Sequence, residues 1–174
     1  MAKPFRYCPS CATELKDPGE DDARACPSCG RTWYVNPAPT AGAVITNKGR
    51  ALITERGSEP YKGKFDVPGG FLDPGEHPID GLKRELREEL QVEVDVTVDD
   101  IIQMHPHEYG EDGEWVLALG FVARPVSGKP TPGSDVASAK WVSLDELDSV
   151  EFAWDHDREL VRKVLKREGA QNGA

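Results

Sequence analysis

Residues 69–92 read G-G-F-L-D-P-G-E-H-P-I-D-G-L-K-R-E-L-R-E-E-L-Q-V. A pair of glycines and a loop rich in turn residues come first. Pro78 then suits the first turn of a helix, where its missing N–H has no partner to lose. After it, apolar residues recur at spacings of three and four, which places them on one stripe: Ile79, Leu82, Leu86 and Leu90. The stretch therefore predicts an amphipathic helix behind a glycine-rich loop.

The charges of this predicted helix are segregated, whereas a solvated helix usually interleaves opposite charges to gain i,i+4 pairs. Crowded carboxylates repel one another unless a cation joins them, and carboxylate oxygens without sulfur or imidazole suit a hard ion such as Mg²⁺ or Mn²⁺. A solvated acidic face is the alternative, and it stays open for any single glutamate. The helical wheel puts Glu85, Glu88 and Glu89 on one flank of the apolar stripe and Lys83, Arg84 and Arg87 on the other.

A longer ordered pattern contains these charges. A glycine lies five intervening residues before Glu76, and seven more separate Glu76 from the run Arg84-Glu85-Leu86-x-Glu88-Glu89. This pattern resembles the signature of the Nudix hydrolases, enzymes that cleave a diphosphate linked to another moiety. One position departs, because Gln91 stands where the family usually has a glycine. That glycine ends the helix in a left-handed conformation, which costs a non-glycine residue about 1–2 kcal/mol.

The resemblance implies a set of metal ligands. Glu85, Glu88, Glu89 and the main-chain carbonyl of Gly69 would bind divalent ions. A further acidic ligand often lies six positions before a tryptophan in the last strand, and Asp135 holds that place here, where many members have Glu.

The resemblance also assigns roles around these ligands. Arg84 would pair with the box glutamates and orient them, and Glu76 is the loop acid of the box, near the substrate. Either Glu88 or Glu89 would take the proton from the attacking water, and members differ in which residue acts. Arg56, which ends a predicted strand, is a candidate to hold substrate phosphate, with ordinary surface charge as an equal alternative.

Residues 1–35 are predicted to form a separate zinc ribbon. Cys8-Pro-Ser-Cys11 is repeated as Cys26-Pro-Ser-Cys29, with fourteen residues between the pairs. Two such C-x-x-C knuckles are typical of a four-thiolate zinc site, and a closed set of this kind is structural. Two disulfides are the alternative, which a reducing compartment disfavours. Residues 16–24 are expected to form an exposed turn, and the balanced charges of the ribbon do not favour nucleic-acid binding.

The two-part layout is similar to the NADH pyrophosphatase group, which carries a four-cysteine ribbon before its Nudix domain. That group is marked by the run S-Q-P-W-P-F-P-x-S after the box, but residues 102–107 read I-Q-M-H-P-H here. NAD(H) is therefore not assigned as the substrate. The best substrate class is a nucleoside diphosphate derivative, such as ADP-ribose or an NAD-like dinucleotide.

The main domain is predicted over residues 36–174, with an extended linker over 33–39. Periodicity predicts strands and a second helix around the box, an α+β sandwich that agrees with the mixed-sheet α/β/α sandwich of the Nudix fold. Residues 105–114 read as a polar loop with solvent-facing histidines. The predicted strands are 41–46 and 50–56 (joined by a hairpin turn at 47–49), 92–98, 101–105, 115–123 and 139–144; the helix is 155–167, before a frayed end at 169–174.

Composition and net charge limit which other functions the chain can have. The chain has 174 residues and a formal net charge of −10, which argues against non-specific duplex binding. No apolar run is long enough for a membrane span, and the first residues lack an apolar signal core, so we expect a cytoplasmic protein and no membrane partner. Two other functions stay open: a nucleotide-sensing regulatory module and a house-cleaning nucleoside triphosphate pyrophosphatase. A homodimer is also open. Trp115, Tyr109, Phe152 and Trp154 are candidates to stack on a base, although aromatic residues more often lie in the core.

Overall fold

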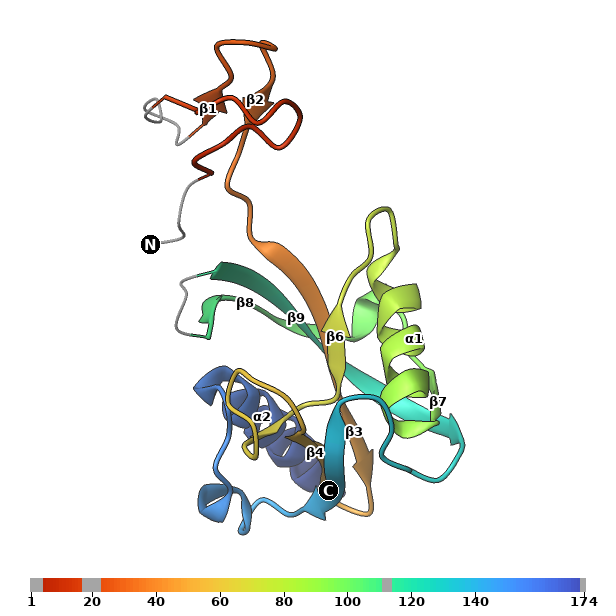
Figure 1. Ribbon diagram of the computed structural model, residues 1–174. Helices are drawn as coiled ribbons and strands as arrows, with labels where there is room; N and C mark the ends of the chain where they lie inside the picture. The colour runs from red at the N-terminus through yellow and green to blue at the C-terminus, as the bar shows by residue number, and fades with distance from the viewer. Residues whose placement is uncertain (1–4, 17–22, 111–113, 173–174) are drawn as a thin grey trace.

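A computed structural model describes residues 5–16, 23–110 and 114–172 (Figure 1). Its N-terminal unit is small, with β1 (Arg24–Ala25) and β2 (Thr32–Trp33) paired antiparallel. The core of this unit consists of Cys8, Leu15 and Cys26, and Trp33 packs against it. Most of the turn expected over 16–24 lies outside the described residues.

The rest of the chain is built on an eight-stranded sheet. Five strands follow the order β10-β4-β3-β9-β7, while β5 pairs with β4, β6 with β3 and β8 with β9. The sheet is mixed, because β3 and β9 are parallel and the other pairs are antiparallel. The strands are β3 (Ala38–Asn47), β4 (Arg50–Arg56), β5 (Phe65–Asp66), β6 (Gly69–Phe71), β7 (Glu93–Asp95), β8 (Ile101–Tyr109), β9 (Glu114–Ser127) and β10 (Val136–Val142).

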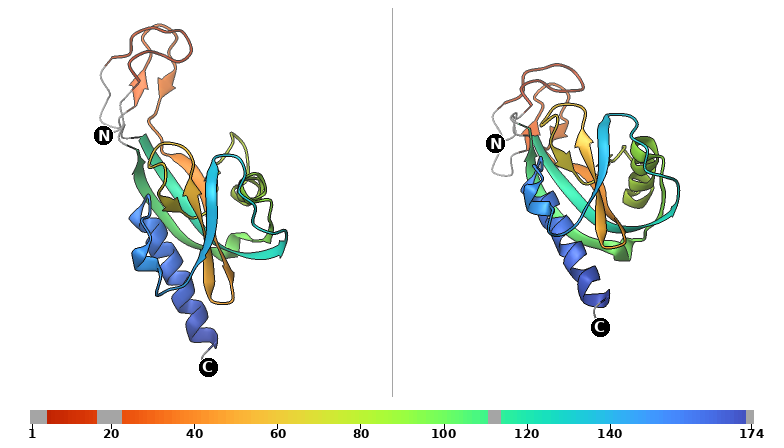
Figure 2. Two further views of the ribbon diagram at one scale, coloured as in Figure 1. Left: turned by 60° about the horizontal axis from the view of Figure 1, so that its bottom comes forward. Right: turned by 90° about the horizontal axis from the view of Figure 1, so that it is seen from below.

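Two helices cover the two faces of this sheet (Figure 2). The helix α1 (Pro78–Leu90) packs on one face through Leu82, Leu86 and Leu90, and α2 (Asp155–Asn172) packs on the other. Short 3-10 turns lie at Val98–Asp100 and Leu147–Ser149. The buried face predicted for α2 is confirmed, with Leu160, Val161, Val164 and Leu165 all buried. The result is the predicted α/β/α sandwich.

Several predicted boundaries are confirmed and others are wrong. The hairpin between β3 and β4 turns at Lys48 and Gly49, which both have positive φ. Strand β8 continues to Tyr109, so the expected polar loop does not begin at residue 105; pairing with β9 overrides the polar composition. The helix α2 runs to Asn172 instead of fraying from residue 169. The strand expected over 92–98 is shorter, because a 3-10 turn replaces its end.

None of the described helices has an apolar stretch long enough to cross a membrane.

Candidate active site

The helix α1 is fixed at both ends by its own sequence. At its start, Pro78 occupies the first turn, and Nδ1 of the N-cap residue His77 accepts a hydrogen bond from the Ile79 N–H at 3.3 Å. At its end, Gln91 adopts the left-handed conformation, with φ 57° and ψ 34°. The backbone N–H of Gln91 donates to the Arg87 carbonyl at 3.0 Å. The helix therefore ends where the box predicts, although a glutamine takes the place of the usual glycine.

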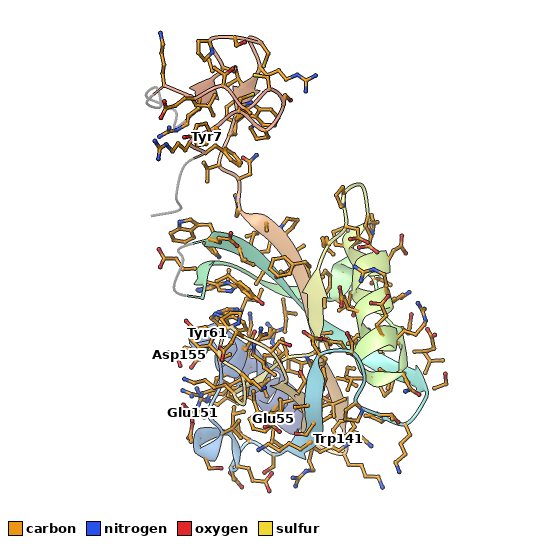
Figure 3. The ribbon with its side chains drawn as sticks, viewed as in Figure 1. Tyr7, Glu55, Tyr61, Trp141, Glu151 and Asp155 are labelled. Atoms are coloured by element: carbon orange, nitrogen blue, oxygen red, sulfur yellow. The ribbon has the colours of Figure 1, made fainter. Side chains whose placement is uncertain are left out.

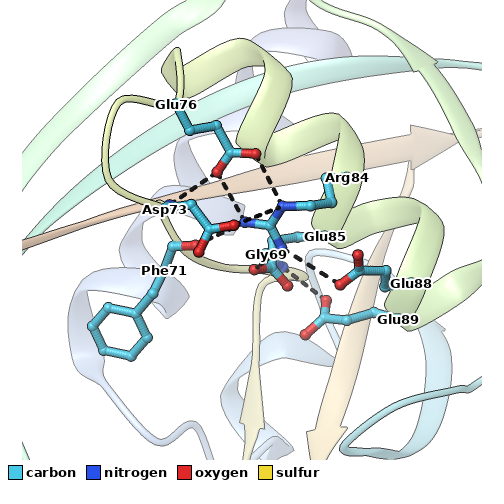
Figure 4. A network of polar contacts seen from close by, with 8 residues as sticks. All are labelled: Gly69, Phe71, Asp73, Glu76, Arg84, Glu85, Glu88 and Glu89. Atoms are coloured by element: carbon cyan, nitrogen blue, oxygen red, sulfur yellow. Dashed lines mark hydrogen bonds and ion pairs between the residues drawn. The ribbon is translucent and has the colours of Figure 1, made fainter.

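Arg84 lies among the carboxylates, so its predicted place on the opposite flank of the helix is wrong (Figure 4). Its Nε and Nη2 both donate to Glu76 at 2.9 Å. Its Nη1 donates to Glu85 at 2.7 Å and to Glu88 at 3.4 Å. Arg84 reaches Glu88 because residues four apart share a side of a helix. The hydrogen bonds from Arg84 lower the pKa of Glu76 to about 2, which keeps this pair charged.

Glu89 is the carboxylate that points inward. Its side chain is buried, and its Oε2 accepts a hydrogen bond from the Gly69 N–H at 2.9 Å. Burial first, and then the nearby carboxylates of Asp66, Asp135 and Glu85, raise the pKa of Glu89 to about 9. A buried carboxyl that is surrounded by other carboxyls favours a cation next to it.

The glycine pair lets the loop approach the helix closely. Gly69 has φ 141°, in a region that side chains rarely adopt. A Cβ on Gly70 would lie 2.6 Å from Cδ of Glu85, which is closer than real Cβ contacts. The box therefore needs glycine here so that Glu85 and Glu89 can lie against the β6 backbone.

A cavity of about 500 Å³ opens beside these acids. Gly69, Glu85, Glu89 and Asp135 all line it, so four of the predicted metal ligands face one space. Glu88 is exposed, contacts Arg84 and is not among the lining residues. Glu76 also lies outside the lining, and its carboxylate is engaged by Arg84. These contacts suit a role in which Glu76 holds Arg84 in position better than the predicted contact with substrate.

Arg56 lines the same cavity away from the helix, and its position is fixed from several sides. Its Nη1 forms an ion pair with Asp66 at 2.8 Å, and its Nε donates to the Pro60 carbonyl at 2.7 Å. Its Nη2 donates to the Tyr109 hydroxyl at 3.0 Å, and its guanidinium lies 4.8 Å from the ring centroid of Trp154. One face and three N–H groups of the guanidinium are therefore in contact with other residues. These contacts fix the positive charge of Arg56 at the cavity.

Other residues of this cavity were missed from the sequence. Asp157 is a buried acid of the lining and Asp66 a partly buried one, and desolvation raises the pKa of both. His107 also lines it, against the expectation that it faces solvent, whereas His105 is exposed as expected; His156 of α2 lines it too. Burial lowers the pKa of His156 to about 3, so its ring is neutral at pH 7. These residues carry no local motif, and only the packing of α2 on the sheet brings them together.

The four cysteines of the ribbon converge. Their sulfurs all lie within 4.8 Å of one another, with Cys8 and Cys29 at 3.7 Å and Cys11 and Cys26 at 3.5 Å. Tetrahedral zinc with bonds of about 2.3 Å requires sulfur separations of about 3.8 Å, so the set fits zinc. Trp33 donates its Nε1–H to the Cys8 sulfur at 3.3 Å. Among the described residues, the carboxylates of α1 do not form a set as tight as these thiols.

The sequence pattern of the NUDIX domain matches residues 36–164. The chain belongs to the Nudix hydrolase family. It is 30% identical over 171 residues to the NAD-capped RNA hydrolase NudC of Pseudomonas aeruginosa, covering 95% of this chain and 58% of that protein. It is 26% identical over 133 residues to the ADP-ribose pyrophosphatase of Methanocaldococcus jannaschii, covering 76% of each.

The Nudix fold is also seen in a solved neighbour. The crystal structure of a NUDIX hydrolase from Nitrosomonas europaea matches with a TM-score of 0.75 and 20% identity, over 95% of this chain and 93% of that one. At this identity the match shows the fold alone. The chain spans a little more than half the length of the NudC proteins that it matches. Nudix enzymes use divalent metals, so the carboxylates of α1 and the cavity beside them are the candidate active site.

Proposed function

We propose that this Nudix domain hydrolyses the diphosphate bond of a nucleoside diphosphate derivative, with Mg²⁺ or Mn²⁺ as cofactor. The observation that carries the proposal is the shared cavity of Glu85, Glu89 and Asp135, with the backbone of Gly69 at its edge. Glu89 is buried, Glu85 is half-buried and Asp135 is exposed, and together these carboxylates facing one space are a donor set for a hard cation. Glu88, at the rim, completes the predicted ligands. Bound divalent ions would neutralise the diphosphate and activate the attacking water.

The protein groups then have separate tasks. Arg84 holds Glu85 and Glu88 in place, and Glu76 holds Arg84 through two hydrogen bonds. A box glutamate, Glu88 or Glu89, takes the proton from water as its oxygen bonds to one phosphorus. The bond from that phosphorus to the bridging oxygen breaks, and the second phosphate leaves. Arg56, fixed by Asp66, is the cation that we expect to contact substrate phosphate.

The relatives bear on the substrate. One carries the name ADP-ribose pyrophosphatase and others the name NAD-capped RNA hydrolase NudC. We therefore propose ADP-ribose or an NAD-like dinucleotide as the substrate. The net charge of −10 argues against long contacts with an RNA backbone, so we do not propose RNA as a binding partner.

We further propose that residues 1–35 form a structural zinc ribbon and residues 36–174 the Nudix domain. The described part of the ribbon has a core of three buried residues, and a metal usually stabilises a unit with so small a core. Free thiols at these spacings suit a reducing compartment, so we place the protein in the cytoplasm. A homodimer is compatible with the proposal and is not required by it.

A substrate panel tests the function. The purified chain is incubated with Mg²⁺ and ADP-ribose, NAD-type dinucleotides, nucleoside diphosphate sugars or nucleoside triphosphates, and the products are separated. We expect two monophosphate products from ADP-ribose or the dinucleotides, and no turnover after chelation. Pyrophosphate release from triphosphates alone would favour the house-cleaning alternative. Tight nucleotide binding without turnover on any substrate would favour the regulatory module.

A further inference from the structure

The segment that joins β9 to β10, residues 128–135, passes across the C-terminal end of α1 (Figure 1). The last carbonyl groups of a helix have no partner within the helix. Here the Thr131 N–H donates to the Leu90 carbonyl at 2.9 Å. The Gly133 N–H donates to the Glu89 carbonyl at 2.8 Å. The segment is therefore bonded to the backbone of the same residue whose side chain points into the cavity.

The other end of the segment is held by β4. Gly57 follows β4 directly, and its N–H donates to the Asp135 carbonyl at 2.7 Å. The register between β10 and β4 then shifts between Val136 and Ser138, and such bulges often re-aim a side chain beside an active site. On the other side, Ser134 adopts φ 53°, which a residue other than glycine keeps only when its surroundings hold it. Asp135 thus lies in a backbone that is fixed from both directions.

Two glycines permit these contacts because they have no side chain. A Cβ on Gly57 would meet the Asp135 carbonyl oxygen, and a Cβ on Gly133 would meet the Glu88 carbonyl oxygen at 2.9 Å. Both would be closer than 3.0 Å, which real Cβ atoms essentially never are, and both neighbours are backbone atoms. Neither glycine has a positive φ, so each position needs glycine for space and not for its backbone conformation.

The place of the Asp135 backbone matters because the side chain is short. Many members of the family have glutamate there, whose extra methylene adds about 1.5 Å of reach. Asp135 nevertheless lines the cavity together with Glu85 and Glu89. Burial first, and the charge of Asp135 among others after it, raise the pKa of both glutamates. A backbone held close to α1 lets the shorter acid take part in this group.

We propose that Gly57 and Gly133 are positioning residues that hold the backbone of Asp135 close enough for its short side chain to join the cation-binding acids of α1. This inference rests on the proposed function, which assigns those acids to a divalent cation. Gly57 also follows Arg56 directly, so one stretch of backbone places both the candidate phosphate ligand and the segment of Asp135. The two close backbone contacts compensate for the missing methylene.

The sheet order gives the direction in which a side chain at Gly57 would move Asp135. In Gly57→Ala the Asp135 backbone must move by about 1 Å to reach an ordinary contact distance from the new Cβ. The strand order is β10-β4-β3, and α1 packs against β3. A movement of β10 away from β4 therefore takes Asp135 away from α1. The displacement is smaller than the length of one methylene, so a glutamate at position 135 would restore the reach.

Mn²⁺ binding in the absence of substrate tests the proposal. The full chain is titrated with Mn²⁺, and the free ion is measured by its electron paramagnetic resonance signal. We expect Gly57→Ala to bind Mn²⁺ about tenfold more weakly, as is typical when a group that orients a metal ligand is disturbed. Adding Asp135→Glu to Gly57→Ala should restore most of that affinity. Gly169→Ala on α2 is the matched control and should bind as wild type, because a Cβ there has nothing within 4 Å.

The recovery separates position from folding, since a general loss of stability would weaken the single and the double variant alike. Equal Mn²⁺ affinity in wild type and Gly57→Ala would overturn the proposal, as would a double variant that recovers nothing. Gly133→Ala, which pushes the segment away from the Glu88 carbonyl, repeats the comparison with and without Asp135→Glu. Its outcome decides the matter if Gly57→Ala does not fold.

Hydrolysis of ADP-ribose is measured on the same proteins, so that the two proposals can fail separately. Hydrolysis by wild type, with unchanged Mn²⁺ affinity in Gly57→Ala, defeats the positioning role while the proposed function stands. Weaker Mn²⁺ binding that Asp135→Glu restores, in a chain that hydrolyses nothing, supports the positioning role and defeats the proposed function.

Discussion

The ribbon and the α1 cavity are both predicted to hold metal, but the chain prepares them in opposite ways. In the ribbon, four thiols already converge within 4.8 Å, and the knuckle backbone is closed by hydrogen bonds from Ala12 to Cys8 and from Gly30 to Cys26. In the cavity, the predicted ligand carboxylates lie on α1 and, at Asp135, just before β10, and Arg84 holds Glu85 at one edge of the group. One site is closed on itself, and the other is open to solvent and substrate.

The two sites would use a bound metal differently. A closed four-thiolate set leaves no position for substrate, so its binding energy goes into folding the ribbon. In the open set, burial and then the repulsion of nearby acids raise the pKa of Glu89. A divalent cation at this site would offset the burial and repulsion of these acids, and under the proposed function it would also contact the diphosphate.

The largest effect is expected from Cys26→Ser, which removes one of the four thiols. Structural zinc contributes on the order of 10 kcal/mol to the folding of small zinc units, and the ribbon core alone is too small to replace it. Zinc content should fall to none, and ribbon amides should lose protection in hydrogen exchange, while those of the Nudix domain keep theirs. Ser28→Ala in the same knuckle is the control. A ribbon that stays protected without zinc contradicts the closed-site assignment.

Glu89→Gln tests the open site, because it removes the inward charge and keeps the size of the side chain. We expect hydrolysis to slow by about 10²–10³-fold, as is typical when one electrostatic group of an active site is lost. The melting temperature should not fall. Glu159→Gln, a matched change on α2 outside the cavity, should leave the rate unchanged. Full Mg²⁺-dependent activity in Glu89→Gln would remove Glu89 from the site.

The sequence predicts those parts of both sites that depend on local spacing. The two C-x-x-C knuckles and the apolar stripe of α1 are periodic patterns, and the structure contains the converging thiols and the helix that they predict. The position where α1 ends also follows from the local sequence, since Gln91 takes the left-handed conformation that the box requires. Arg84 was assigned to the wrong flank, although its spacing of four from Glu88 places the two side chains together.

The residues that were missed come together only through tertiary contacts. Asp66 lies on β5, which pairs with β4 and also with the segment before α2 through the bridge between Phe65 and Phe152. That bridge brings Trp154 and Asp157 to the cavity, far in sequence from the box. Other polar side chains, among them Asp155 and Glu151, also lie at this end of the molecule (Figure 3), although they are not part of the cavity lining. Composition alone could not separate them from Asp157.

A smaller effect is expected from a change at Arg84, which holds the carboxylates of the open site in position. Arg84→Lys keeps the charge but loses the paired hydrogen bonds to Glu76, and we expect a loss of activity of about 10–100-fold with a higher Mg²⁺ requirement. Arg87→Lys is the matched control, because Arg87 lies on the same helix outside the cavity and makes a similar double contact with Glu93 of β7. Equal losses in the two variants would show that helix stability, not ligand orientation, explains the effect.

The smallest effect is expected from two glycine substitutions at left-handed positions, one in each region. Gln91 ends α1 with φ 57°, and Ala12 follows the first knuckle with φ 56°, where Gly30 follows the second with φ 71°. Glycine relieves about 1–2 kcal/mol of strain at such positions but loses part of that gain to backbone entropy, so a net gain of about 0.5–1 kcal/mol is expected.

In thermal unfolding, Gln91→Gly should raise the melting temperature of the Nudix domain by about 2–4 °C. Ala12→Gly should leave that transition unchanged and instead raise the chelator concentration needed to strip zinc from the ribbon. If Ala12→Gly shifted the Nudix transition as much as Gln91→Gly, the two regions would unfold as one unit, and the contrast between a closed folding site and an open catalytic site would lose its thermodynamic basis.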